Sequence, residues 1–81
     1  DYIIKPHARE RMRECAIPAA LVRDALEEPT QVGYDARGRI LIKKSYMRSG
    51  KERLLLIAGE RTGDVLVIIT VIDTSKVKKY L

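Results

Sequence analysis

The sequence predicts an α+β domain in which two N-terminal helices pack on a four-stranded antiparallel sheet. Apolar residues follow helical spacing in the first third of the chain, whereas alternating or continuous apolar runs occupy the remainder. Short turn sequences separate those runs, and short connections between successive strands favour antiparallel pairing. With 81 residues, of which 46% are hydrophobic, the chain is expected to form one domain, 1–81, around a small core.

Two helices are expected after an extended lead-in at residues 1–5. Pro6 suits the first turn of a helix, and an apolar stripe continues from it to about Glu14. The stripe consists of Ala8, Met12 and Cys15. A second helix starts at Pro18 with an inward apolar face, and Pro29 ends it because the residue before a proline is disfavoured in the helical region.

Four strands are expected after the second helix, because the apolar period there changes to two. They cover residues 30–34, 39–47, 53–60 and 65–73. The third and fourth are nearly continuous apolar runs, which is typical of central strands covered on both faces. Asp, Gly and Ser in the intervening segments supply the turns. Residues 74–81 are expected to form a short strand or a helical turn.

The charge distribution indicates a polyanionic partner. Sixteen Lys and Arg against eleven Asp and Glu give a net charge of +5, and basic residues crowd the segment 37–53, where Glu52 is the only acid. Arg39, Lys43 and Arg53 are expected to align on one sheet face and to follow the phosphates of an RNA. The alternative is a sheet edge kept soluble by its charges.

A metal site, a cofactor and a membrane span are not expected. One His and one Cys cannot supply the three or four protein ligands that zinc takes, and Cys15 is expected to be a small buried hydrophobe. The single-glycine segments 35–39 and 48–52 precede strands rather than helices, so neither is a phosphate loop. The apolar runs are too short to cross a bilayer, and a single cysteine suits a reducing, cytoplasmic compartment.

The segment 6–13 contains the only histidine, His7, and Arg11 follows one helical turn later on the same side. A histidine exchanges protons near neutral pH, and an arginine can hold a phosphate through two nitrogens. Together they suit metal-free RNA cleavage, in which a 2′-OH attacks the adjacent phosphate. The alternative is a basic helix with His7 at its start and Arg11 solvated, and the residues by themselves favour this alternative.

The segment HARERMRECAIPAALVRDALEEP, followed by basic strands and by VLVIITVID, resembles a family of small bacterial domains of unknown function. That family opens with His-Ala-x-x-Arg-Met. It is similar in layout to BrnT-type toxins and is grouped with the barnase–EndoU–colicin–RelE superfamily of metal-independent ribonucleases. The resemblance covers nearly the whole chain, and it implies a RelE/BrnT-like fold and a toxin-like endoribonuclease.

The resemblance marks three catalytic residues: His7 as the proton-transfer group, Arg11 as the phosphate clamp, and Thr70 as a positioning group for one of them. The alternative for Thr70 is a hydroxyl that bonds a neighbouring backbone carbonyl. The family usually has Arg-Gly where this chain has Cys15 and Ala16. The missing glycine is expected to alter how the first helix ends.

The expected partners are RNA and an antitoxin-like protein that covers the positive face. Two other classes of function remain open. One is a nucleic-acid-binding module without cleavage, which would bind RNA in a salt-dependent way. The other is a protein-interaction domain, including a homodimer assembled through strand edges.

Overall fold

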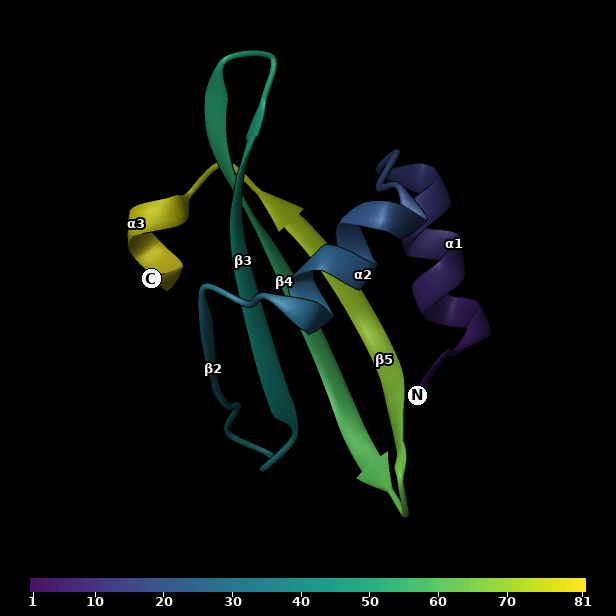
Figure 1. Ribbon diagram of the computed structural model, residues 1–81. Helices are drawn as coiled ribbons and strands as arrows, with labels where there is room; N and C mark the ends of the chain where they lie inside the picture. Colours follow the sequence, from purple (N-terminus) through teal and green to yellow (C-terminus); the bar gives the residue numbers. More distant parts are fainter.

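The chain folds in the order β1-α1-α2-β2-β3-β4-β5-α3 in the computed structural model, which describes residues Asp1–Leu81 (Figure 1). The strands form one twisted sheet with the spatial order β1-β5-β4-β3-β2. The helices are α1 (Pro6–Glu14), α2 (Ala19–Glu27) and α3 (Val77–Tyr80). The strands are β1 (Tyr2–Ile4), β2 (Gln31–Tyr34), β3 (Ile40–Arg48), β4 (Lys51–Thr62) and β5 (Val65–Thr74).

The α+β class and the two N-terminal helices are confirmed, but the prediction of a four-stranded antiparallel sheet is wrong. The lead-in forms a fifth strand, β1, which runs parallel to β5, with Tyr2 opposite Leu66 and Ile4 opposite Ile68. The other pairings are antiparallel, so the sheet is mixed. Because β1 pairs with a strand near the other end of the chain, no local sequence pattern indicates this pairing.

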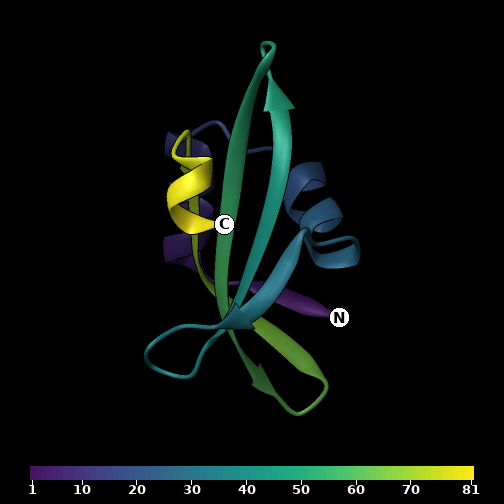
Figure 2. The same ribbon diagram turned by 90° about the vertical axis from the view of Figure 1, so that its left-hand side faces the viewer.

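The helices α1 and α2 contribute to one apolar core against the sheet, and Figure 1 shows α2 in front of β4 and β5, with α1 beside β5. The helices supply Ala8, Met12, Val22 and Ala25, and the strands supply Ile42, Leu55, Ile57, Ile68 and Val71. Cys15 is half-buried against this core, as a small hydrophobe would be. The short helix α3 lies on the other side of the β3–β4 hairpin from α2 (Figure 2).

The expectation that the third predicted strand is central and covered on both faces is confirmed for β4. Leu55 and Ile57 are completely buried in the helix-side core. Leu54 and Leu56 point to the opposite face and are 0% and 8% exposed. The strand β5 pairs with β4 on one edge, and on its other edge it pairs with β1 only at residues 66–68. The helix α1 also packs against β5.

The helix α1 ends in a Schellman motif, in which the left-handed residue is usually a glycine. The amide of Ile17 donates to the carbonyl of Met12 at 2.8 Å, and the amide of Ala16 donates to that of Arg13 at 3.3 Å. Ala16 takes a φ of +53°, in the left-handed region that favours glycine. The position without the glycine is thus filled by an alanine that takes the left-handed conformation itself, at the cost of strain.

Replacing this alanine is expected to stabilise the protein. Ala16→Gly should raise the free energy of unfolding by about 1 kcal/mol, since the left-handed strain of alanine outweighs the chain entropy that glycine adds to the unfolded state. Denaturant unfolding measures the change. Ala20→Gly in α2 is the matched control and should lower stability, because that residue is already helical. A loss of stability in Ala16→Gly would contradict the assignment of strain.

Candidate functional site

The first turn of α1 is open to an anion. Pro6 occupies its first position, Lys5 precedes it without a side-chain cap, and the turn contains no acidic residue. The amides of His7 and Ala8 have no backbone acceptor, and the first amide bonded within the turn is that of Arg9. His7 is exposed here. The turn therefore presents a free amide beside the only imidazole, at the positive end of the helix dipole.

Arg11 lies one turn after His7, and long side chains on a helix lean toward its N-terminus. The same side of the helix therefore carries both residues. Arg11 is half-buried, and its Nε is buried without a hydrogen-bond partner. It forms no ion pair, whereas the exposed Arg13 pairs with Glu10 at 2.6 Å. Arg11 is therefore only partly solvated, and its Nε–H carries the cost of a buried donor without an acceptor.

Thr70 stands on β5, the strand against which α1 packs. It sits opposite Ala58 in the β4–β5 ladder, and successive residues of a strand point to opposite faces. It therefore faces away from the core that Val71 and Met12 share. The structure places His7 and Arg11 on the same side of α1, but no hydrogen bond joins either side chain to Thr70.

Arg39, Lys43 and Arg53 do not align on one face, so this prediction is wrong. Lys43 pairs with Leu56, which points away from the helix-side core, whereas Arg53 pairs with Tyr46, which packs against that core. Arg39 precedes β3 in the turn after β2. Only the register between strands decides these directions, and the sequence of a single strand does not contain it.

Each of these three cations also has a partner within the protein. Lys43 donates to the backbone carbonyl of Tyr80 in α3. Arg39 pairs with Asp35, with 2.9 Å between Nε and Oδ2. Arg53 pairs with a carboxylate of β5, described next. Lys43 therefore anchors α3, and Arg39 is held by its own turn.

A network around Asp73 was missed by sequence reasoning. The Asp73 side chain is 5% exposed, and it accepts hydrogen bonds from the Tyr46 hydroxyl at 2.6 Å and from Arg53 Nε at 3.0 Å. Arg48 approaches the same carboxylate at 3.8 Å. These residues come from three adjacent strands, so no linear motif contains them. The one available indication was Asp73 itself, an acid at the end of the apolar run VLVIITVID.

The network is a structural clamp. Burial raises the pKa of Tyr46, and its hydrogen bond to the Asp73 carboxylate adds to the effect. Partial burial opposes the charge of Arg53, but the charge and hydrogen bonds of Asp73 outweigh it, so the pKa of Arg53 is raised. A neutral tyrosine and two guanidinium groups thus hold one carboxylate. They fasten the β3–β4 hairpin to β5.

Removing the central charge of this clamp is expected to destabilise the fold. Asp73→Asn should lower the free energy of unfolding by about 1–3 kcal/mol, because Arg53 and Tyr46 lose a buried charged acceptor. Denaturant unfolding gives the value. Asp64→Asn, at an exposed turn position, is the control and should change stability by less than about 0.5 kcal/mol. Equal effects of the two variants would contradict the clamp.

The raised pKa of Tyr46 predicts a specific loss of stability at alkaline pH. The stabilisation is complete below the unfolded-state pKa of 10.0, and it disappears as pH rises through the higher pKa of the folded state. Above pH 10 the free energy of unfolding should therefore fall more steeply for the parent than for Tyr46→Phe. Urea unfolding at a series of pH values measures both slopes. Parallel curves would show that the hydroxyl is not held by Asp73.

Comparisons with protein-family models, with curated proteins and with solved structures found no match for this chain. No three side chains of His, Cys, Asp or Glu gather into a group that could hold a metal ion. No helix is long and apolar enough to cross a membrane.

Proposed function

We propose that this chain is a toxin-like, metal-independent endoribonuclease domain that cuts RNA at the N-terminus of α1. The observation that carries the proposal is the uncapped, acid-free first turn of this helix. It presents the exposed His7 together with Arg11, whose Nε is buried and unpartnered. The resemblance to the toxin-like family, through its His-Ala-x-x-Arg-Met motif, supports the same function.

In the proposed reaction one RNA phosphate lies at the first turn of α1. The free His7 amide, the helix dipole and the Arg11 guanidinium bind its non-bridging oxygens. Neutral His7 accepts the proton of the adjacent 2′-OH as that oxygen forms a bond to phosphorus. The bond from phosphorus to the 5′-oxygen breaks, and the leaving oxygen takes a proton from water. The products are a 2′,3′-cyclic phosphate and a 5′-OH.

Arg11 acts on the charge that develops during this step. The pentacoordinate phosphorus carries more negative charge than the starting diester, and a guanidinium already held in place stabilises it without reorganisation. Partial burial of Arg11 limits competition from water for that interaction. An antitoxin-like protein with an acidic surface is the partner expected for a chain with a net charge of +5.

The second candidate is a nucleic-acid-binding module that does not cleave. One observation favours it: Thr70 faces away from the core that α1 packs against, and it forms no hydrogen bond with His7 or Arg11, the residues that the family resemblance has it position. This candidate predicts salt-dependent RNA binding with no product.

The test is incubation of the protein with mixed RNA in excess EDTA. The parent should release fragments that end in a 2′,3′-cyclic phosphate, and His7→Ala and Arg11→Ala should each lower the rate by about a hundredfold or more. Arg9→Ala is the matched control, because it removes the same charge from the opposite side of the same helix. It should cleave nearly as fast as the parent.

The other outcomes separate the candidates. Equal rates in the parent, His7→Ala and Arg11→Ala would reject the site, since the cleavage would come from elsewhere. A parent that binds RNA in a salt-sensitive way and releases no fragments would reject the ribonuclease and leave the binding module. Circular dichroism on each variant shows that a lost activity is not a lost fold.

A further inference from the structure

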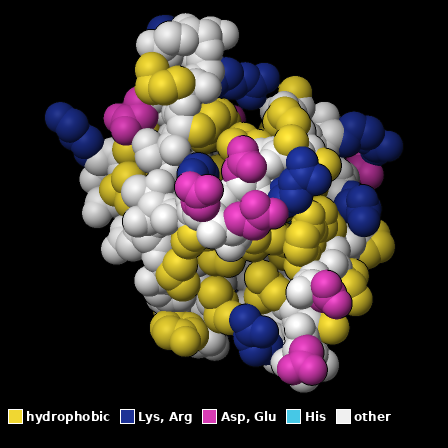
Figure 3. Space-filling view, viewed as in Figure 1, with side chains coloured by type: hydrophobic (Ala, Val, Ile, Leu, Met, Phe, Trp, Pro, Cys, Tyr) yellow, Lys and Arg dark blue, Asp and Glu magenta, His cyan; other side chains and the backbone are white.

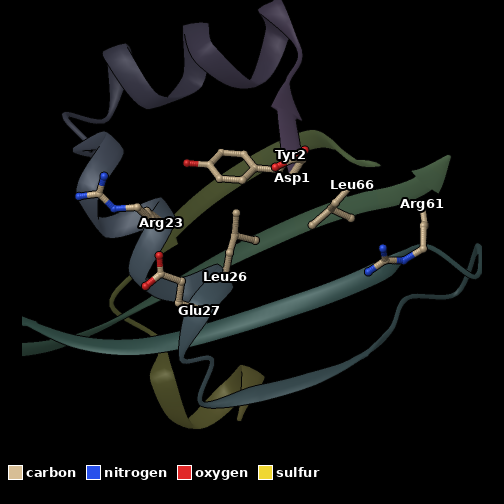
Figure 4. A pocket seen from close by; sticks show the side chains of 7 residues that line it. All are labelled: Asp1, Tyr2, Arg23, Leu26, Glu27, Arg61 and Leu66. Atoms are coloured by element: carbon tan, nitrogen blue, oxygen red, sulfur yellow. The ribbon is translucent and has the colours of Figure 1, made fainter. Parts of the chain in front are cut away.

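Two adjoining hollows lie on the helix-covered face of the sheet, near the end where β4 meets β5. The first, of about 540 Å³, lies between α2 and the strands β1, β4 and β5. Figure 4 shows Tyr2 and Leu26 directed into it, with Arg23 on the α2 side and Arg61 on the β4 side. The second, of about 530 Å³, lies beside the β2–β3 turn. Arg61 lines both hollows, so they meet at this residue.

The strand register directs the side chains of these hollows to a single face. Tyr2 lies opposite Leu66, and Leu66 lies opposite Arg61. Tyr34 lies opposite Ile40, which packs against the helix-side core. Since paired residues share a face, both tyrosines and Arg61 point the same way. The tyrosines stand on the two edge strands, four strand spacings or about 19 Å apart.

The hollow beside the β2–β3 turn is rich in arginine. The Asp35 carboxylate accepts hydrogen bonds from the backbone amides of Arg37 and Arg39, each at 2.9 Å. It also accepts one from Arg39 Nε at the same distance. The backbone amide of Arg39 contributes most to lowering the pKa of Asp35, so the carboxylate stays charged and holds that guanidinium. Arg37 and Arg61 are exposed and form no ion pair. Two free cations, Arg37 and Arg61, therefore border this hollow, beside the Arg39–Asp35 ion pair and Glu60.

Aromatic surface accompanies these cations. Tyr34 is 75% exposed and lines the same hollow as Arg37 and Arg61. Tyr2 is 39% exposed in the neighbouring hollow. Exposed tyrosine rings beside arginines are the combination that binds bases by stacking and phosphates by charge.

Acidic residues border this surface, chiefly over α2, although Glu60 also lines the turn-side hollow and Asp1 the α2 hollow. Figure 3 shows acidic side chains gathered over α2, and Asp24, Glu27 and Glu28 lie there around Lys44. Glu27 also lines the α2 hollow. A phosphate chain would therefore be repelled from α2 and attracted to the turn side. The phosphate contacts are accordingly expected at Arg37, Arg39 and Arg61, and a base contact at each tyrosine.

We infer that the paired hollows, from Tyr34 through Arg37, Arg39 and Arg61 to Tyr2, form a binding site for single-stranded RNA. The choice of RNA as ligand rests on the proposed function, whereas the site lies on different residues from His7 and Arg11. Only Arg39 belongs to the set that the sequence predicted, because Lys43 points to the other face and Arg53 is held by Asp73. Single strands fit better than a duplex, since exposed rings stack on unpaired bases.

The test measures binding of a fluorescein-labelled 2′-O-methyl RNA oligonucleotide by fluorescence anisotropy at several salt concentrations. This probe has no 2′-OH and cannot be cut, so cleavage does not enter the result. Arg37→Ala and Arg61→Ala should each weaken binding about tenfold and reduce the salt slope by about one. Tyr34→Ala should weaken binding about tenfold, and Tyr34→Phe should restore it because the ring is kept.

Lys51→Ala is the charge-matched control, because it removes an exposed cation from the β3–β4 hairpin at the other end of the sheet (Figure 1). It should weaken binding by less than about twofold. If Arg37→Ala and Arg61→Ala weaken binding no more than Lys51→Ala, the inference is overturned. Failure of the parent to bind the oligonucleotide overturns it as well.

The outcomes also distinguish this inference from the ribonuclease proposal. Binding that depends on Arg37 and Arg61, in a protein that cleaves no RNA, supports the inference and rejects the ribonuclease. Cleavage that depends on His7, with oligonucleotide binding indifferent to Arg37 and Arg61, supports the ribonuclease and overturns the inference. His7→Ala should bind the 2′-O-methyl probe as well as the parent does.

Discussion

The burial of β4 on both faces is the constraint on which the rest of the structure depends. Leu55 and Ile57 complete the helix-side core, and Leu54 and Leu56 are buried on the opposite face. A strand that is apolar on both faces does not define its own register, since a one-residue slip would still bury apolar side chains. Register must come from elsewhere. The two-residue turn Ser49–Gly50, with positive φ at both residues, provides it at one end.

The Asp73 clamp fixes the same register from the neighbouring strand, because Tyr46 and Arg53 reach one carboxylate only when they are paired opposite each other. Once the register is fixed, the two arginines of β4 are set on the helix-covered face at opposite ends. Arg53 forms an ion pair with Asp73, whereas Arg61 has no ion-pair partner and lines both hollows. The same pairing thus determines which cation is structural and which is available to a ligand.

The sequence predicted the helices and the later strands closely because the residues that begin and end these elements lie within or next to them. Pro6, Pro18 and Pro29 mark the helices, and changes of apolar period mark the strands. It did not predict β1 or the clamp, since both depend on contacts between distant segments; Tyr46 and Asp73, for example, are 27 positions apart. The candidate pair His7 and Arg11 could be read from spacing on one helix. The residues proposed to bind RNA could not be predicted, because the sequence of a strand does not say which of its faces the helices cover until the register is known.

The central claim is that RNA contacts this chain at the first turn of α1 and along the hollows beside the β2–β3 turn. An NMR titration of the ¹⁵N-labelled protein with the 2′-O-methyl oligonucleotide tests it most directly, because each backbone amide reports separately. The account predicts shifts at the free His7 amide, at Tyr34 and Arg37, and at Arg61. Shifts confined to α3 and the opposite face of the sheet, or no shifts at all, would contradict it.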